Sequence, residues 1–257
     1  MQPHKLLTAL TLALTILPLS ASAASAPAPA STEAIAPDRY DDLYDAMRTG
    51  IDDTAMIDGQ LDTIKTQMMA QDALLAAAEQ ASPGLMDTIG EAMRPVLSEY
   101  SERVRLQFRP RMVAVMRSTF TDKEAGQLSE MYRSTAGKGL MRSMSQNYKG
   151  EATIGQAIVE KEVDAKAINR DFSAATSQAT KAMPDDQKAE MAQYFLKNPS
   201  LFLKLGTLSR DAAAIRVEME NAPMTADEEA RMQQAIVTAI EAHVGHSAPA
   251  SAKAVSK

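Results

Sequence analysis

The 257-residue chain contains no cysteine and no tryptophan, and only three histidines. Without cysteine there can be no disulfide framework, thiol nucleophile, thiolate metal site or lipid-modified cysteine. An oxidising compartment would therefore place no burden on this chain. Aromatic residues make up 4% of the sequence, and alanine and methionine take the place of the aromatic and β-branched residues that strands favour. The composition predicts helices.

The amino terminus is typical of a secretory signal peptide. Lys5 precedes an apolar run from Leu6 to Leu19, and the small residues 21–23 follow at the positions that cleavage requires. The run is shorter than the about 20 apolar residues of a membrane span, and no later stretch could cross a bilayer. We therefore predict cleavage after Ala23, export to the periplasm or secretion, and no transmembrane segment in the processed chain.

Acidic residues outnumber basic residues, 33 to 27, and the formal net charge is −6. The predicted signal peptide holds one basic residue and no acid, so the processed chain would carry 26 − 33 = −7. Nucleic acid is an unfavourable partner for such a chain, because it is bound through an excess of lysine and arginine. The expected partner is an unknown protein or a lipid-like ligand.

Composition divides the rest of the chain into three parts. Residues 24–37 form a tract of alanine, proline and serine with nothing to bury, and residues 246–257 have the same character. We predict a flexible linker and a disordered tail there, with one helical domain over residues 38–245. The expected fold class is all-α, a multi-helix bundle of antiparallel amphipathic helices.

Apolar seams with steps of three and four residues indicate where these helices lie. One seam runs from Ile57 to Ala78 and predicts a helix that starts at a cap formed by Asp53 or Asp58. The longest seam runs from Ile154 to Ala179 and is interrupted by Lys161. Each such helix has one apolar stripe and must pack against others.

A further seam runs from Met86 to Phe108 and contains Pro95. Proline lacks the N–H that a helix interior needs and clashes with the preceding turn. We therefore expect Pro95 to kink this helix or to mark a boundary, and Pro110 to end it.

Two helix starts carry a capping box, in which a threonine cap stands three residues before a glutamate. They are Thr121 with Glu124, and Thr225 with Glu228; between them, Pro184 opens a third helix. The segments after Thr121 and Pro184 also match at an offset of 63 residues. The matched residues are Leu128, Met131, Tyr132 and Leu140 in the first segment, and Met191, Tyr194, Phe195 and Leu203 in the second. The match indicates either a duplicated helical hairpin or two hairpins with convergent helix chemistry.

The segment from Phe120 to Met144 carries a recognisable motif: an aromatic residue, a capped acidic helix, a second aromatic position and a Gly-Lys turn. The residues at these places are Phe120, Thr121, Glu124, Tyr132, Ser134, Gly137 and Lys138. In this pattern the segment resembles the exported bacterial family called domain of unknown function 2059. Thr135 stands where that family usually has proline, and Met131 where it usually has phenylalanine. The resemblance implies a helical exported domain with no assigned activity.

A cluster of arginines follows Pro95. Its members are Arg103, Arg105, Arg109 and Arg111, flanked by Arg94 and Arg117, and only two acids lie among them. Such a patch is suited to lipid phosphate or another anion, because arginine binds these groups through paired hydrogen bonds. The alternative is that the arginines pair with the Asp-rich first helix of the same chain.

The small number of histidines limits both histidine-based catalysis and metal binding. After loss of the signal peptide only His243 and His246 remain, near the predicted end of the last helix. Gly245 lies between them and Glu241 is the only nearby acidic ligand, so a solvated helix end is favoured over a metal site. We expect no metal ion, no cofactor and no histidine-based catalysis.

One enzyme class stays open. Lytic transglycosylases use a lone catalytic glutamate followed about fifteen residues later by a Gly-Leu-Met-Gln turn, and Glu124 precedes the Gly-Leu-Met of residues 139–141 by that interval. Against this, Ala125, Gln127 and Arg142 depart from the enzyme's pattern. Glu124 is also already assigned to the capping box.

The leading functional prediction is a non-catalytic periplasmic helical protein that binds a protein partner or an apolar, lipid-like ligand. Methionine is abundant on the apolar stripes, where it fills irregular cores but can also form an adaptable groove. The alternative is a peptidoglycan-cleaving, lytic transglycosylase-like enzyme with Glu124 as general acid and base.

Overall fold

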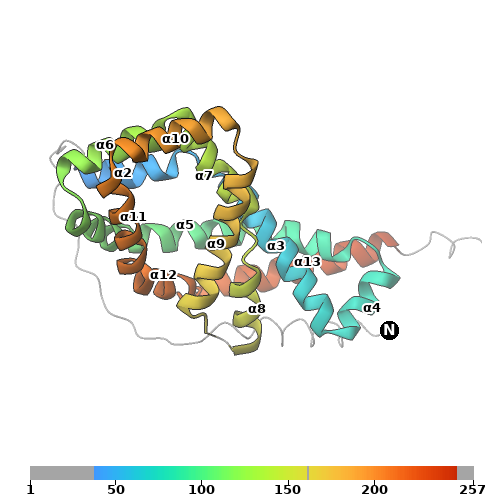
Figure 1. Cartoon of the computed structure of the whole chain (residues 1–257). Coiled ribbons are helices and arrows are strands. Elements are labelled where there is room, and N and C mark those ends of the chain that lie inside the picture. The colour runs from blue at the N-terminus through green and yellow to red at the C-terminus, as the bar shows by residue number, and fades with distance from the viewer. Residues whose placement is uncertain (1–37, 161, 248–257) are drawn as a thin grey trace, which may run out of the picture.

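The computed structural model describes residues 38–160 and 162–247, and all regular elements in these ranges are α-helices (Figure 1). The first six are α2 (Arg39–Arg48), α3 (Asp53–Gln71), α4 (Ala73–Ala81), α5 (Leu85–Thr119), α6 (Asp122–Arg133) and α7 (Thr135–Asn147). They are followed by α8 (Glu151–Glu160), α9 (Ala165–Ala182), α10 (Asp185–Lys197), α11 (Pro199–Asp211), α12 (Ala213–Glu220) and α13 (Ala226–Ser247). The predicted all-α, multi-helix fold is confirmed.

Helix α5 is the longest helix of the described residues and the centre of the packing. Its 35 residues span roughly 50 Å at 1.5 Å per residue, and helices α2, α3, α4, α11, α12 and α13 pack against it (Figure 1). Helices α3, α4 and α13 pack around its first half through one apolar core, which includes Leu61, Ile89 and Ile236. Helices α2, α6 and α11 pack against its second half through another, which includes Leu43, Met116 and Leu128. Long helices with one apolar stripe each can bury it only in this way.

The expectation that Pro110 ends this helix is wrong, because α5 runs through both Pro95 and Pro110 to Thr119. Each proline deprives only one carbonyl of its donor, that of the residue four positions earlier. Here those residues are Glu91 and Leu106, and both are exposed, as are the prolines themselves. Water can therefore donate hydrogen bonds to these two carbonyls on the solvent side of the helix. The apolar stripe continues on the other side.

The other two seams each cover two helices instead of one. Asp72 ends α3 and caps α4 by accepting hydrogen bonds from the N–H groups of Leu74 and Leu75, at 2.8 and 3.1 Å. Asp52, not Asp53 or Asp58, caps α3. The longest seam likewise breaks between α8 and α9, where Asp164 caps the second helix. Both breaks preserve the spacing of three and four, so the apolar pattern alone does not reveal them.

Two helical hairpins have matching bounds. Helices α6 and α7 begin at residues 122 and 135, and α10 and α11 begin at residues 185 and 199, offsets of 63 and 64. The apolar residues that match in sequence lie on corresponding helices, but their environments differ. Leu128, Met131 and Tyr132 are buried beneath α2, whereas α10 has no fully buried residue. The second hairpin is the less covered of the two.

Several predicted boundaries lie at or beyond the ends of the described residues. The signal peptide of residues 1–23 and the linker of 24–37 lie outside them, as do residues 248–257 of the predicted tail. Helix α13 continues to Ser247, so the tail cannot begin at 246 as predicted; Gly245 does not stop the helix. In the described ranges, no helix combines the length and the apolar character that crossing a membrane requires.

Candidate binding site

Glu124 has a structural role at the start of α6. Its carboxylate accepts a hydrogen bond from the Thr121 N–H at 2.8 Å, and the Glu124 N–H donates to the Thr121 hydroxyl oxygen at 3.3 Å, which confirms the predicted capping box. The same carboxylate contacts Lys204 Nζ of α11 at 2.6 and 2.8 Å. The Lys204 ammonium, followed by the Thr121 backbone bond, lowers the pKa of Glu124. A general acid needs the opposite shift, so this geometry supports the structural role.

The arginines of α5 are paired with carboxylates of the same chain. Arg103 makes a two-pronged contact with Glu228 of α13, at 2.8 Å for both bonds, and also donates to the Pro223 carbonyl. Arg111 pairs with Glu218 of α12. Arg105 pairs with Glu102, one turn earlier on α5 itself.

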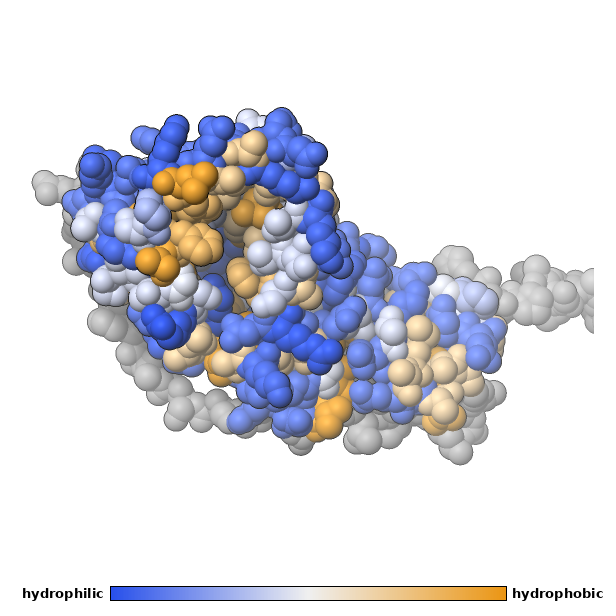
Figure 2. All heavy atoms as spheres, viewed as in Figure 1, coloured by the Kyte–Doolittle hydropathy of each residue, from blue (hydrophilic) through white to orange (hydrophobic). Residues whose placement is uncertain are grey.

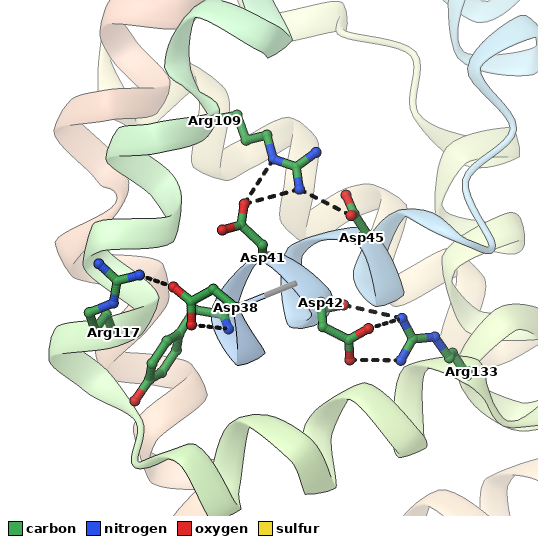
Figure 3. A network of polar contacts seen from close by, with 8 residues as sticks. Asp38, Asp41, Asp42, Asp45, Arg109, Arg117 and Arg133 are labelled. Atoms are coloured by element: carbon green, nitrogen blue, oxygen red, sulfur yellow. Dashed lines mark hydrogen bonds and ion pairs between the residues drawn. The ribbon is translucent and has the colours of Figure 1, made fainter. Parts of the chain in front are cut away.

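Two arginines of the cluster, Arg109 and Arg117, bind the acidic first helix, as the alternative interpretation of the sequence predicted (Figure 3). Arg109 contacts Asp41 and Asp45 at 3.0 Å each, and Arg117 contacts Asp38. On the other side of α2, Arg133 of α6 contacts Asp42 at 2.6 Å. The Arg133 hydrogen bond lowers the pKa of Asp42. These pairs hold α2 between α5 and α6. Arg94 pairs with Asp58 and Glu91, so each arginine of the cluster has a carboxylate partner among the described residues.

The residues of the family-like motif form the start of α6 and the turn between α6 and α7. The Phe120 ring is buried and its carbonyl accepts the Tyr40 hydroxyl at 3.0 Å, which ties α2 to the start of α6. Ser134 caps α7 by accepting the Gly137 N–H at 3.2 Å. Tyr132 is buried and Lys138 is exposed. A Cβ on Gly137 would meet the backbone of α6, with Tyr132 Cα at 2.8 Å, so only glycine fits there. The motif is thus a packing motif.

His243 lies near a hydroxyl group of another helix. Its Nδ1 lies 3.1 Å from the Thr88 hydroxyl, between α13 and α5. The side chain of His246 lies outside the described residues. Across the described ranges, no three side chains of the metal-binding types come together.

A cluster that the sequence did not indicate brings together four polar residues from α9, α12 and the end of α7. They are Tyr148, Asp171, Arg216 and Glu220. Asp171 is buried and accepts the N–H groups of Ala152 and Thr153, at 2.9 and 2.8 Å, at the start of α8. The Arg216 guanidinium lies 5.0 Å from the centre of the Phe172 ring, and its Nη1 has no hydrogen-bond partner. Burial lowers the pKa of Arg216.

Glu220 is the residue of this group with the most unusual environment. Part of the Glu220 residue is exposed to solvent, but protein atoms surround its carboxyl group. This burial, followed by the charge of Asp171, raises the pKa of Glu220 to about 7. Because solvent reaches the side chain, the effect on stability is smaller than for a fully buried group.

This shift predicts a pH-dependent stability. Since the folded pKa lies above the ordinary 4.5, the native chain loses stability through Glu220 as the pH rises from about 4.5 to about 7. Glu220→Gln removes that loss, so its melting temperature should exceed the wild type's above pH 7 and converge with it below pH 4.5. Thermal melts followed by circular dichroism across this range provide the measurement.

Glu218→Gln is the matched control on the same helix. Arg111 lowers the pKa of Glu218, so this group stabilises the native chain above its ordinary pKa and the effect is lost as the pH falls. The control should therefore be less stable than the wild type at neutral pH. A Glu220→Gln effect of equal size at every pH would contradict the assignment.

The main apolar surface feature is at the corner between α10 and α11. Leu196, Phe202 and Leu203 are 80, 63 and 73% exposed and lie within eight residues of one another; we call them the corner patch. Figure 2 shows strongly hydrophobic side chains over α10 and α11. The opposite side of α11 is anchored in the core by Leu201 and Leu208. The 63-residue match pairs Leu203 with Leu140. Leu140 is half-buried, whereas Leu203 is exposed because no helix covers it.

One small pocket of the core is bordered by methionines. A pocket between α3, α5 and α13, bordered by Met68, Met86 and Met93, has a volume of about 20 Å³. This is room for one water molecule, not for a lipid chain or a helix. Methionine here fills the core.

Comparison with known proteins identifies no relative: no protein-family model, no curated protein and no solved structure matches the chain. The resemblance to the domain of unknown function 2059 family therefore stays a prediction that rests on residues 120–144.

Proposed function

We propose that the chain is a non-catalytic helical binding protein that acts after export and binds an apolar partner or ligand at the corner patch. The observation that carries this proposal is the exposure of Leu196, Phe202 and Leu203 on two adjoining helices. Isolated apolar side chains on a surface are ordinary, but a group of large ones marks interaction sites.

The surroundings of the patch support the same interpretation. Helix α11 is fixed to the body by buried Leu201 and Leu208 and by the contact between Lys204 and Glu124. Phe202 also packs edge-to-face on Phe195, with 5.6 Å between the ring centres. The exposed side chains are thus presented by a supported scaffold, which lowers the entropy cost of binding.

A titration with Nile red, an uncharged dye that fluoresces in apolar surroundings, tests the proposal. The chain of residues 24–257, which retains every described helix, should bind the dye. The variant Leu196→Ser, Phe202→Ser, Leu203→Ser should bind it at least about tenfold more weakly, since each buried leucine or phenylalanine contributes about 1.5–3 kcal/mol.

The matched control is Leu74→Ser, Leu106→Ser, which removes leucines that are 55 and 51% exposed on α4 and α5. This control should bind the dye as the wild type does. Equal binding by the corner-patch variant, or an equal loss in the control, would show that the corner patch is not the binding surface.

A further inference from the structure

The corner patch lies in an unusual stretch of the sequence. Residues 191–210 contain no acidic residue, although acids outnumber bases in the chain as a whole, and they include Lys197, Lys204 and Arg210. Lys204 is engaged with Glu124. Lys197 is exposed beside Leu196 and forms no ion pair with the residues that the structure describes. Arg210 contacts Asp211 at 3.7 Å, so the patch is apolar and has one basic side chain beside it, Lys197, that pairs with none of the described acids.

The patch is poorly suited to pairing with a second copy of the chain. Its three side chains expose on the order of 400 Å². Two such patches in contact would bury on the order of 800 Å², below the about 1,200 Å² at which stable protein interfaces begin. Their flanking lysines would also repel each other.

A lipid surface makes smaller demands. A few apolar side chains can enter the boundary between headgroups and acyl chains, because the lipid adapts its shape to them. A lysine beside them can lay its aliphatic stem along the apolar region and keep its ammonium at the phosphates. Leu196 and Lys197 are adjacent in this arrangement, at the last turn of α10.

We propose that the α10–α11 corner docks on an anionic lipid bilayer, with Leu196, Phe202 and Leu203 inserted at the acyl boundary and Lys197 at the phosphates. This inference rests on the proposed function and specifies its partner. The sequence suggested a lipid contact at the arginines of α5, but these arginines are paired with carboxylates. The proposal assigns the lipid contact to the corner patch and Lys197 instead.

Vesicle flotation tests the inference. The chain of residues 24–257 is used because the apolar segment 6–19 would itself enter lipid. It should float with vesicles of equal parts phosphatidylcholine and phosphatidylglycerol, and less with phosphatidylcholine alone. The variant Leu196→Ser, Phe202→Ser, Leu203→Ser should lose at least about tenfold in bound fraction, and Leu74→Ser, Leu106→Ser should lose nothing.

Lys197→Gln separates the charge from the apolar contact. It should weaken flotation several-fold on the anionic vesicles and leave that on neutral vesicles unchanged. The replaced side chains are exposed, so circular dichroism should show all variants folded. Absence of flotation by the wild type, equal flotation by the triple variant, or no preference for anionic vesicles would overturn the inference.

The outcomes are distinct from those for the proposed function. Nile red binding at the corner patch without flotation would leave the binding function standing and exclude the bilayer, which directs the search to a protein partner. Loss of both would remove the two proposals together.

Discussion

Gly137→Ala should destabilise the chain by about 3 kcal/mol or more, the largest effect expected of any single methyl group added here. The new Cβ would lie 2.8 Å from Tyr132 Cα and 2.9 Å from the Tyr132 carbonyl oxygen, and it would also clash with the Met131 carbonyl. These are backbone atoms, which cannot turn aside as a side chain can. The two helices of the hairpin would have to separate, and the buried contacts of Tyr132 would open with them.

Gly90→Ala is the control for this prediction. Gly90 lies inside α5, and a Cβ there meets nothing within 4 Å. Alanine is the better helix former, so this variant should be more stable than the wild type by about 0.5–1 kcal/mol. Urea unfolding followed by circular dichroism measures both. A Gly137→Ala variant as stable as the wild type would show that the hairpin is packed less tightly than described.

Arg103→Met should destabilise the chain by about 3 kcal/mol, the second large effect. The Glu228 side chain is only 6% exposed and depends on Arg103 for two hydrogen bonds at 2.8 Å. Without the guanidinium, a buried carboxylate loses both charged hydrogen bonds and keeps its contacts with Thr225, among them the bond from the Thr225 N–H. The Arg103 bond lowers the pKa of Glu228, so the contribution is present above the ordinary pKa and is lost as the pH falls through the folded value.

Arg111→Met provides the comparison. Arg111 also joins α5 to a carboxylate of a later helix, Glu218, but both side chains are about half exposed. Exposed pairs contribute little, so the unfolding midpoint should shift much less than for Arg103→Met. The pair of variants also tests the anion-patch hypothesis, since a binding role would leave stability unchanged in both. Equal midpoints for both variants and the wild type would support that hypothesis over the pairing described here.

Local signals in the sequence predicted local structure well. The threonine of each capping box and the glutamate three residues later identified the starts of α6 and α13, because both bonds are formed within four residues. The apolar seams predicted helices for the same reason. They missed the breaks at Asp72 and before Asp164, since a cap that preserves the spacing leaves the seam intact.

Properties that depend on distant parts of the chain were not predictable. The sequence left two roles open for Arg109, which were anion binding and pairing with the first helix. Only the packing of α2 against α5, which brings Asp41 and Asp45 to Arg109, decides between them. Nothing near Glu220 in the sequence indicates a raised pKa, because burial depends on the packing of α12 and Asp171 comes from another helix, α9. The same holds for Leu203, which matches the half-buried Leu140 in sequence but lacks a covering helix.

The central claim is that the α10–α11 corner is a binding surface, and hydrogen exchange with mass spectrometry tests it most directly. The chain of residues 24–257 would be compared with and without the apolar dye, and then with and without anionic vesicles. Both additions should slow exchange in peptides that cover residues 191–206 and leave the core helices α3 and α13 unchanged. Slower exchange at α3 and α13 alone, or no change anywhere, would contradict the account.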